Sequence, residues 1–372
     1  MTEIQQLTRT TGATTRVLIN CFFLMLFAYL AYTFTGRIKF IYACISSDTN
    51  RLFMFGSSVL IVLLIMLMFG VRAIYGSPNM YGVDRFEYWG NIAPAWAGYA
   101  RFVLQHLSMV MGLMYVVKRS KIYIFLFIAS VISQILVGDK FTGLYLSVIF
   151  FLIPVVLLDN INLWKKIFSA KMMLYAALFL GILVTSSLIS YYAISRGFEA
   201  EDKFMNRIYL QAQMWWSVDY HSTGNVASFD SIIKHFFGFG ADEKDTGIRY
   251  LMGIIASAKI YEIFMFRGVT FTMGSPVNFI YFFGFPLSIL VSCSFGVILG
   301  SFFRVITESI KSKDVILAIL SVKLYYISIS IFSMGDVNML FDIKTIACFV
   351  IFLCYSLLSC LLVRNNKFIV NR

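Results

Sequence analysis

The chain has 372 residues, of which 59% are hydrophobic, 17% aromatic and 13% charged, and its net charge is +12. Soluble domains carry roughly 25% charged residues, so this composition and the mean hydropathy of +0.80 exclude a water-soluble enzyme and a disordered chain. Unbroken apolar runs favour membrane-spanning helices, because the strands of a barrel would alternate apolar and polar residues. The sequence therefore predicts an all-α, polytopic membrane helix bundle.

Nine apolar runs have lengths close to the roughly 20 residues that cross a bilayer as a helix. In chain order they cover residues 17–34, 52–71, 92–116, 122–137, 141–158, 172–194, 277–303, 315–334 and 345–363. We expect about 9–11 transmembrane helices in all, because one short apolar stretch between the first two runs is ambiguous. Three parts follow: an N-terminal transmembrane bundle (1–195), a large loop (196–276) and C-terminal transmembrane helices (277–372).

Lysine and arginine set the predicted orientation of these spans. The connections 37–51, 118–121, 165–171 and 304–313 each hold three basic residues, whereas the alternate connections 72–91, 138–140 and 335–344 hold two, one and one. The richer set belongs in the cytoplasm, which places the C-terminus inside and the large loop outside. An odd number of spans would put the N-terminus outside, although Arg9 and Arg16 favour the inside.

The large external loop concentrates the polar chemistry of the chain. It holds nine of the 19 carboxylates, eight basic residues, and His221 and His235 out of three histidines. Two amphipathic helices are predicted in it, over residues 204–218 and 248–266. Arg207, Gln211 and Trp215 share one face of the first at four-residue spacing, and the second suits a helix that lies in the membrane interface. The alternative is a structural cap without chemistry.

Basic residues on the predicted outer side suit a phosphate-bearing ligand. Arginine binds phosphate oxygens with two parallel hydrogen bonds, and lysine acts as a point charge. For any single arginine, the alternative is a partner for a nearby Asp or Glu. The residues are Lys140, in the tight turn 138–140, and Arg196, Arg207, Arg249 and Arg267. Arg101 lies inside the third span near its outer end, where snorkelling to the surface is the alternative to a functional role.

Metal and nucleotide motifs are absent from the sequence. There is no HExxH, no DxD, no Cys/His quartet, and no Walker or Rossmann glycine pattern. The Gly-Phe-Gly at 238–240 is expected to form a turn and not a phosphate cradle. The sequence therefore predicts no metal and no cofactor, and the basic excess is explained by topology and not by nucleic acid.

Several local features occur in a fixed order along a chain that has one large late outer loop and few helices after it. The features are Gly138-Asp139-Lys140 at the start of a span, Arg207 with Trp215 eight residues later, the Phe237-Gly238-Phe239-Gly240 turn, and Asn278 with Gly284 and Pro286 at the start of the post-loop span. In these features and their order the chain resembles bacterial O-antigen polymerases, which join oligosaccharide repeat units, and more distantly O-antigen ligases.

Two positions depart from the family pattern. Ligases usually carry His-Asn where this chain has Val277-Asn278, so the polymerase interpretation is favoured over the ligase. Relatives often have Ser-Arg near the position of Asp139-Lys140. The missing histidine also leaves the general base open among His221, His235, Asp219 and Glu201.

The resemblance implies a GT-C-like architecture and a multi-pass protein of the bacterial inner membrane. It implies glycosyl transfer at the periplasmic face, from undecaprenyl pyrophosphate to a second lipid-linked repeat unit, without a metal. Arg207 and Lys140 are expected to stabilise the leaving pyrophosphate together with Arg249, Arg267 and Arg196. His221 or His235 is expected to act in catalysis.

The same resemblance assigns further binding residues and partners. Trp215, Gln211, Asn278 and Arg101 are the expected substrate contacts. The expected partners are undecaprenyl-pyrophosphate-linked oligosaccharides, the lipid bilayer and a chain-length regulator protein, with no nucleic acid. The alternatives are an O-antigen ligase, another lipid-linked glycosyltransferase, or a flippase or transporter of lipid-linked oligosaccharide.

Overall fold

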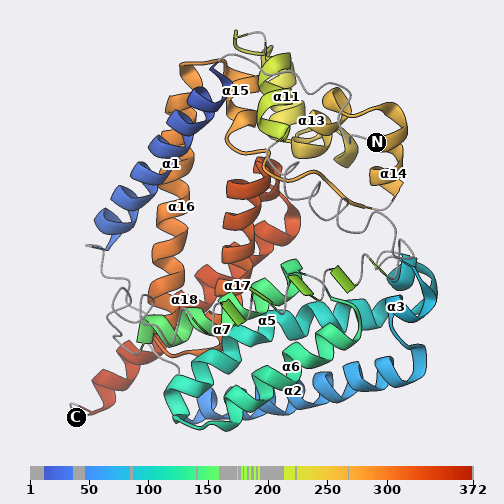
Figure 1. The fold of residues 1–372 in the computed structure, drawn as a ribbon. Coiled ribbons are helices and arrows are strands. Elements are labelled where there is room, and N and C mark those ends of the chain that lie inside the picture. Colours follow the sequence, from blue (N-terminus) through green and yellow to red (C-terminus); the bar gives the residue numbers. More distant parts are fainter. Residues whose placement is uncertain are drawn as a thin grey trace. The chain divides into compact units, whose positions relative to one another are not determined.

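The computed structural model describes residues 12–36, 47–83, 87–139, 141–158, 213–222, 224–266 and 268–370, with isolated positions between 174 and 192 (Figure 1). These residues are mainly helical, and no β-strand occurs among them. The all-α prediction is therefore confirmed for the described part of the chain.

The described helices lie in both halves of the chain. Those of the first half are α1 (Ala13–Thr35), α2 (Ser47–Tyr75), α3 (Pro78–Tyr81), η1 (Tyr88–Ile92), α5 (Ala95–Lys118), α6 (Ile122–Leu136) and α7 (Phe141–Leu158). Those of the second half are α11 (Gln213–His221), α12 (Phe229–Ser231), η3 (Ile232–Phe236), η4 (Glu243–Asp245), α13 (Gly247–Ile255), α14 (Ala258–Phe266), α15 (Val277–Phe283), α16 (Leu287–Lys311), α17 (Val315–Ile329), η5 (Ser330–Met334), η6 (Val337–Leu340) and α18 (Ile343–Val370).

Five of the described helical segments are long and apolar enough to cross a membrane. They are Ala13–Thr35, Asn50–Tyr81, Ala95–Lys118, Leu287–Lys311 and Val315–Met334. Shorter apolar helices cover Ile122–Leu136, Gly143–Leu158 and Ile343–Tyr355. Their length and apolar composition support the prediction of a helical membrane protein, and most of the predicted span 172–194 lies outside the described residues.

The predicted span 277–303 is wrong in its first turns. The structure breaks it into α15 and α16 at Gly284-Phe285-Pro286. Gly284 has a positive φ of 67°, and Pro286 has no N–H to continue the helical hydrogen bonding. Because the residues around the break are apolar, hydropathy alone did not reveal it.

The two helices predicted in the large loop differ from those observed. The predicted helix 248–266 is two helices, α13 and α14, which are interrupted at Ala256 and Ser257. Of the predicted helix 204–218, the described part is α11, which continues to His221. The apolar face of α13 is buried, as its amphipathic pattern predicts.

The chain divides into two compact units that are not continuous in sequence. Unit 1 contains Met1–Ile41, Ile208–Ile306 and Lys323–Tyr355, and unit 2 contains Tyr42–Arg207, Thr307–Val322 and Ser356–Arg372. The first helix therefore shares a unit with the helices of the large loop. In unit 2, α5 is mostly buried.

In unit 1, α1 and α16 pack side by side in the same direction (Figure 1). The Ser292 hydroxyl donates to Asn20 Oδ1 at 2.7 Å, and the Arg304 guanidinium lies 5.4 Å from the Tyr32 ring centre. Between these contacts, a Cβ at Gly300 would lie 2.1 Å from the Ala28 carbonyl oxygen. Small residues at four-residue spacing thus let the two helices approach closely, as in many membrane helix pairs.

Candidate functional site

Of the two histidines predicted for the site, His235 is the one whose ring is held in place by its surroundings. It lies on η3, half-buried, and its ring stacks on Tyr250 of α13, with 4.0 Å between the ring centres and 7° between the planes. Its Nδ1 lies 2.7 Å from the Asp245 carbonyl oxygen. A carbonyl only accepts, so Nδ1 carries the hydrogen and Nε2 holds the lone pair when the ring is neutral.

Tyr250 and Tyr281 continue this arrangement from α13 to α15. Their side chains hydrogen-bond to each other, and burial together with this bond raises the pKa of Tyr281 well above its ordinary value. Tyr281 therefore stays protonated in the physiological range. The pair fixes the ring on which His235 stacks.

The N-terminus of α13 is capped by a carboxylate from the turn after η5. Asp336 Oδ1 accepts a hydrogen bond from the Ile248 backbone N–H at 3.0 Å. Burial raises the pKa of Asp336, and the Ile248 N–H and Arg249 oppose this rise. Asn338 Nδ2 donates to the Thr246 hydroxyl oxygen at 3.2 Å, beside the same helix end. The His235 region and the turn after η5 thus meet at residues 245–248.

Arg249, a predicted pyrophosphate ligand, lies at this helix end. It pairs with Glu243, and their side chains are 26% and 80% exposed. Such an ion pair is worth about 0–1 kcal/mol. Arg249 can therefore exchange its partner for an incoming phosphate at little cost.

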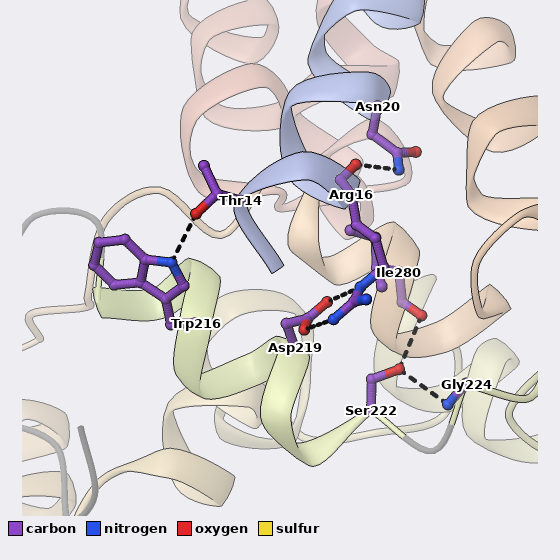
Figure 2. A network of polar contacts seen from close by, with 8 residues as sticks. All are labelled: Thr14, Arg16, Asn20, Trp216, Asp219, Ser222, Gly224 and Ile280. Atoms are coloured by element: carbon purple, nitrogen blue, oxygen red, sulfur yellow. Dashed lines mark hydrogen bonds and ion pairs between the residues drawn. The ribbon is translucent and has the colours of Figure 1, made fainter. Parts of the chain in front are cut away.

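A second polar network joins α11 to the first turns of α1 (Figure 2). Arg16 donates two hydrogen bonds to Asp219, from Nε to Oδ1 at 2.9 Å and from Nη2 to Oδ2 at 2.5 Å. The Trp216 indole N–H donates to the Thr14 hydroxyl at 3.1 Å. Asp219 is almost fully buried and is held by a permanent cation, so its carboxylate is a poor general base, although it was one of the four candidates.

The remaining predicted residues of unit 1 have other environments. His221 is exposed at the end of α11, with its ring edge against Tyr220. The Trp215 indole N–H donates to the Ser275 carbonyl at 3.3 Å. Asn278 is buried and donates to the Gly335 carbonyl at 2.9 Å. The Trp215 bond therefore joins α11 to the segment before α15, and the Asn278 bond joins α15 to the turn after η5.

In unit 2, Arg101 belongs to a polar cluster where α5, α6 and α7 meet. Its Nη1 donates to Asp139 Oδ1 at 2.6 Å, and Gln105 Nε2 donates to Asp139 Oδ2 at 2.6 Å. The Arg101 guanidinium also lies 4.7 Å from the Trp89 ring centre. The pair is buried, with 21% of the Arg101 side chain and 3% of the Asp139 side chain exposed.

Five predicted site residues and one alternative base lie outside the described residues. They are Lys140, Arg196, Arg207, Gln211, Arg267 and Glu201. Arg16, Tyr250 and Asp336 were missed by the sequence analysis. For Asp336 the sequence offers a local signal, because Gly335-Asp336 forms a turn between two apolar runs. For Arg16 and Tyr250 no local signal points to their partners. Among the described residues, no group of three or more His, Cys, Asp or Glu is placed to hold a metal ion.

Comparison with known proteins adds one partial match. The model described as "Family of unknown function (DUF6418)" matches residues 241–364, which includes α13 to α17 and the first part of α18. The matched stretch contains Arg249, Asn278 and Asp336, and it begins after His235. No curated protein and no solved structure matches the chain.

Proposed function

We propose that this membrane protein is a metal-independent glycosyltransferase that polymerises lipid-linked oligosaccharides, as an O-antigen polymerase does. It acts at the periplasmic face of the bacterial inner membrane as a multi-pass protein of GT-C-like architecture. The donor is a glycan on undecaprenyl pyrophosphate, and the acceptor is a second lipid-linked repeat unit. A separate chain-length regulator is part of the proposal.

The observation that carries the proposal is the orientation of His235. The bond from Nδ1 to the Asp245 carbonyl and the stack on Tyr250 hold the ring and leave Nε2 as the basic nitrogen. A base held in this way suits the activation of a sugar hydroxyl. Asp219 is engaged by Arg16 and His221 is exposed, so His235 is the best of the described candidates.

The chemical step needs only groups of the protein and the two substrates. The acceptor hydroxyl forms a bond to the anomeric carbon of the donor while its proton passes to His235 Nε2. The bond from that carbon to the pyrophosphate oxygen breaks, and the lipid pyrophosphate leaves with the electron pair. Cations near the leaving group lower the barrier because negative charge gathers there.

Among the described cations, burial decides which one suits the pyrophosphate. Arg101 is committed to the buried Asp139, and breaking such a pair is costly. Arg249 faces the exposed Glu243 and is available. Among the described residues, the proposal therefore assigns the pyrophosphate to Arg249 and gives Arg101 a structural role. The other predicted ligands, which are Lys140, Arg196, Arg207 and Arg267, lie outside the described residues and stay predictions.

The test replaces His235 in cells that make the polysaccharide. His235→Phe keeps a stacking ring without a base, and His235→Gln keeps a hydrogen-bond donor. Both should lower polymerisation by about 100-fold or more and leave one repeat unit on lipopolysaccharide gels, while His221→Ala, the matched control, keeps the ladder. An unchanged ladder in both His235 variants would contradict the assignment.

The deletion phenotype separates the alternatives. Loss of a polymerase leaves a single repeat unit on the lipid core. Loss of a ligase or of a flippase removes even that unit. A deletion strain without the single unit would therefore reject the polymerase.

A further inference from the structure

Three aromatic rings gather on the surface of unit 1, and we call them the aromatic triad: Phe237, Phe239 and Phe341. The ring centres of Phe239 and Phe341 are 4.9 Å apart, and Phe237 lies 5.9 Å from Phe341 and 6.3 Å from Phe239. Phe239 and Phe341 keep 47% and 42% of their surface exposed. The rings thus contact one another, and those of Phe239 and Phe341 keep nearly half of their surface exposed, whereas Phe237 is half-buried against the core of the unit.

The backbone holds the triad in place. The Phe239 N–H donates to the Ile233 carbonyl at 3.0 Å, and the Phe341 N–H donates to the Asn338 carbonyl at 3.0 Å. Gly238 has a φ of 81°, and a Cβ there would lie 2.8 Å from the Asn338 Cβ. Only glycine lets the turn after η3 approach η6 this closely, so the fold is built to present Phe239 beside Phe341.

Phe341 lies between two apolar helices. The candidate span Val315–Met334 ends just before it, and α18 begins two residues after it, at Ile343. Two residues of chain reach at most about 7 Å. Ile343 is 82% exposed, and Ile346 and Val350 on the same helix are about half exposed. In a membrane protein an exposed apolar helix face contacts lipid, so Phe341 lies near the level of the bilayer surface.

We propose that the aromatic triad is a membrane-contact surface that inserts into the interfacial region of the leaflet on this side of the protein. Phenylalanine and leucine are typical of the apolar surfaces that insert into that region. Lipid supplies the cover that the protein does not. The triad thereby holds the turn after η3 against the bilayer surface.

If the proposed function is correct, the position of the aromatic triad also restricts which sugar reaches His235. His235 precedes Phe239 by four residues in the same short segment. In the proposed step the base must lie beside the anomeric carbon of the donor, and that carbon is bonded to the lipid pyrophosphate. A base within a few residues of the lipid surface therefore suits this donor sugar, which is held close to the bilayer by its lipid.

Aromatic rings also stack on sugars, and the position of Phe341 decides between the two occupants. A sugar platform would be expected away from the apolar helices, with polar side chains around it. Phe341 instead follows a span and precedes an exposed apolar helix, and phenylalanine lacks the polar handle that Tyr or Trp offers. Lipid is the occupant that these observations favour.

The experiment measures depth in the bilayer directly. Phe239→Trp and Phe341→Trp variants of the full chain are placed in vesicles whose lipids carry bromine at defined acyl positions, and the quenching of the five native tryptophans in the parent protein is subtracted. We expect both new tryptophans to be quenched by shallow bromines and to emit at shorter wavelength. Phe229→Trp, exposed on α12 outside the triad, is the matched control and should be quenched less.

Each other outcome overturns the proposal. Absence of quenching at both positions places the triad in water. Absence of quenching with a shift in emission on adding a soluble repeat-unit oligosaccharide makes it a sugar platform. Equal quenching at position 229 shows that the contact is not specific to the triad.

The functional consequence is tested separately. Phe239→Asp should shorten the glycan ladder, and Phe239→Leu should preserve it because leucine also partitions into lipid. The quenching result does not depend on activity. Quenching with a normal ladder in Phe239→Asp would therefore reject the link to catalysis, whereas the absence of any ladder defect in the His235 variants would reject the proposed function.

Discussion

Two ion pairs of the same chemistry differ in what surrounds them. Arg101 and Asp139 in unit 2 are largely buried, and both Asp139 oxygens are occupied by Arg101 and Gln105. Arg249 and Glu243 in unit 1 meet at the surface, where the carboxylate is 80% exposed. An arginine on the predicted outer side is therefore a ligand candidate only where a ligand can replace its carboxylate partner. The burial of that carboxylate decides whether it can be replaced.

The largest expected effect is on the buried pair. Asp139→Ala leaves Arg101 without its carboxylate and should lower the free energy of unfolding by about 3 kcal/mol, the low end for buried pairs because Arg101 keeps 21% exposure. The measurement is thermal unfolding in detergent. The double variant Arg101→Met, Asp139→Leu removes both charges and should recover most of the loss. If this folded double variant made no polymer, the structural role given to Arg101 would be wrong.

A smaller effect on stability is expected at the exposed pair. Arg249→Ala should change the free energy of unfolding by less than about 1 kcal/mol, but it should shorten the glycan ladder because a pyrophosphate ligand is lost. Arg249→Lys should restore it only in part, since lysine cannot bind two oxygens in parallel. Lys234→Ala, which breaks another exposed pair of unit 1 with Asp230, is the control and should keep the ladder. Equal ladders in all three variants would remove Arg249 from the site.

The smallest expected effect concerns Asp336 and the way the free energy of unfolding changes with pH. Burial raises the pKa of this carboxyl above its value in the unfolded chain, so the folded state binds the proton more tightly. Stability therefore falls as the pH rises from the ordinary Asp value through the raised pKa, and it is regained in acid. Asp336→Asn can still accept from the Ile248 N–H and should lose this dependence. Unfolding measured across that pH range checks it, and an unchanged slope would contradict it.

Much of the fold was readable from apolar runs. The spans predicted at 17–34, 52–71, 92–116 and 315–334 correspond to α1, α2, α5 and α17 with η5. The break at Gly284 could not be predicted from the apolar runs, because apolar residues continue across it. The sequence indicates a closely packed face on α16, because small residues recur every four positions at Ser288, Ser292, Gly296 and Gly300. Their spacing within one helix does not predict that the partner is α1.

Less of the candidate site could be predicted. His235 was proposed as a loop histidine, but its orientation depends on the backbone carbonyl of Asp245, and backbone acceptors leave no mark on residue types. Arg16 and Asp219 are 203 residues apart, so no local pattern joins them. Arg249 was identified by its charge alone, and the exposure of its partner Glu243 distinguished it from Arg101, whose partner Asp139 is buried, only once the fold was known.

The shared direction of α1 and α16 constrains how often the chain threads the bilayer. If two helices traverse it in the same sense, the polypeptide between them must return an odd number of times. The five runs predicted between residues 52 and 194 satisfy that parity, and a count of four or six would not. The hydrogen bond from Ser292 to Asn20 therefore bears on whether the number of crossings between α1 and α16 is odd or even.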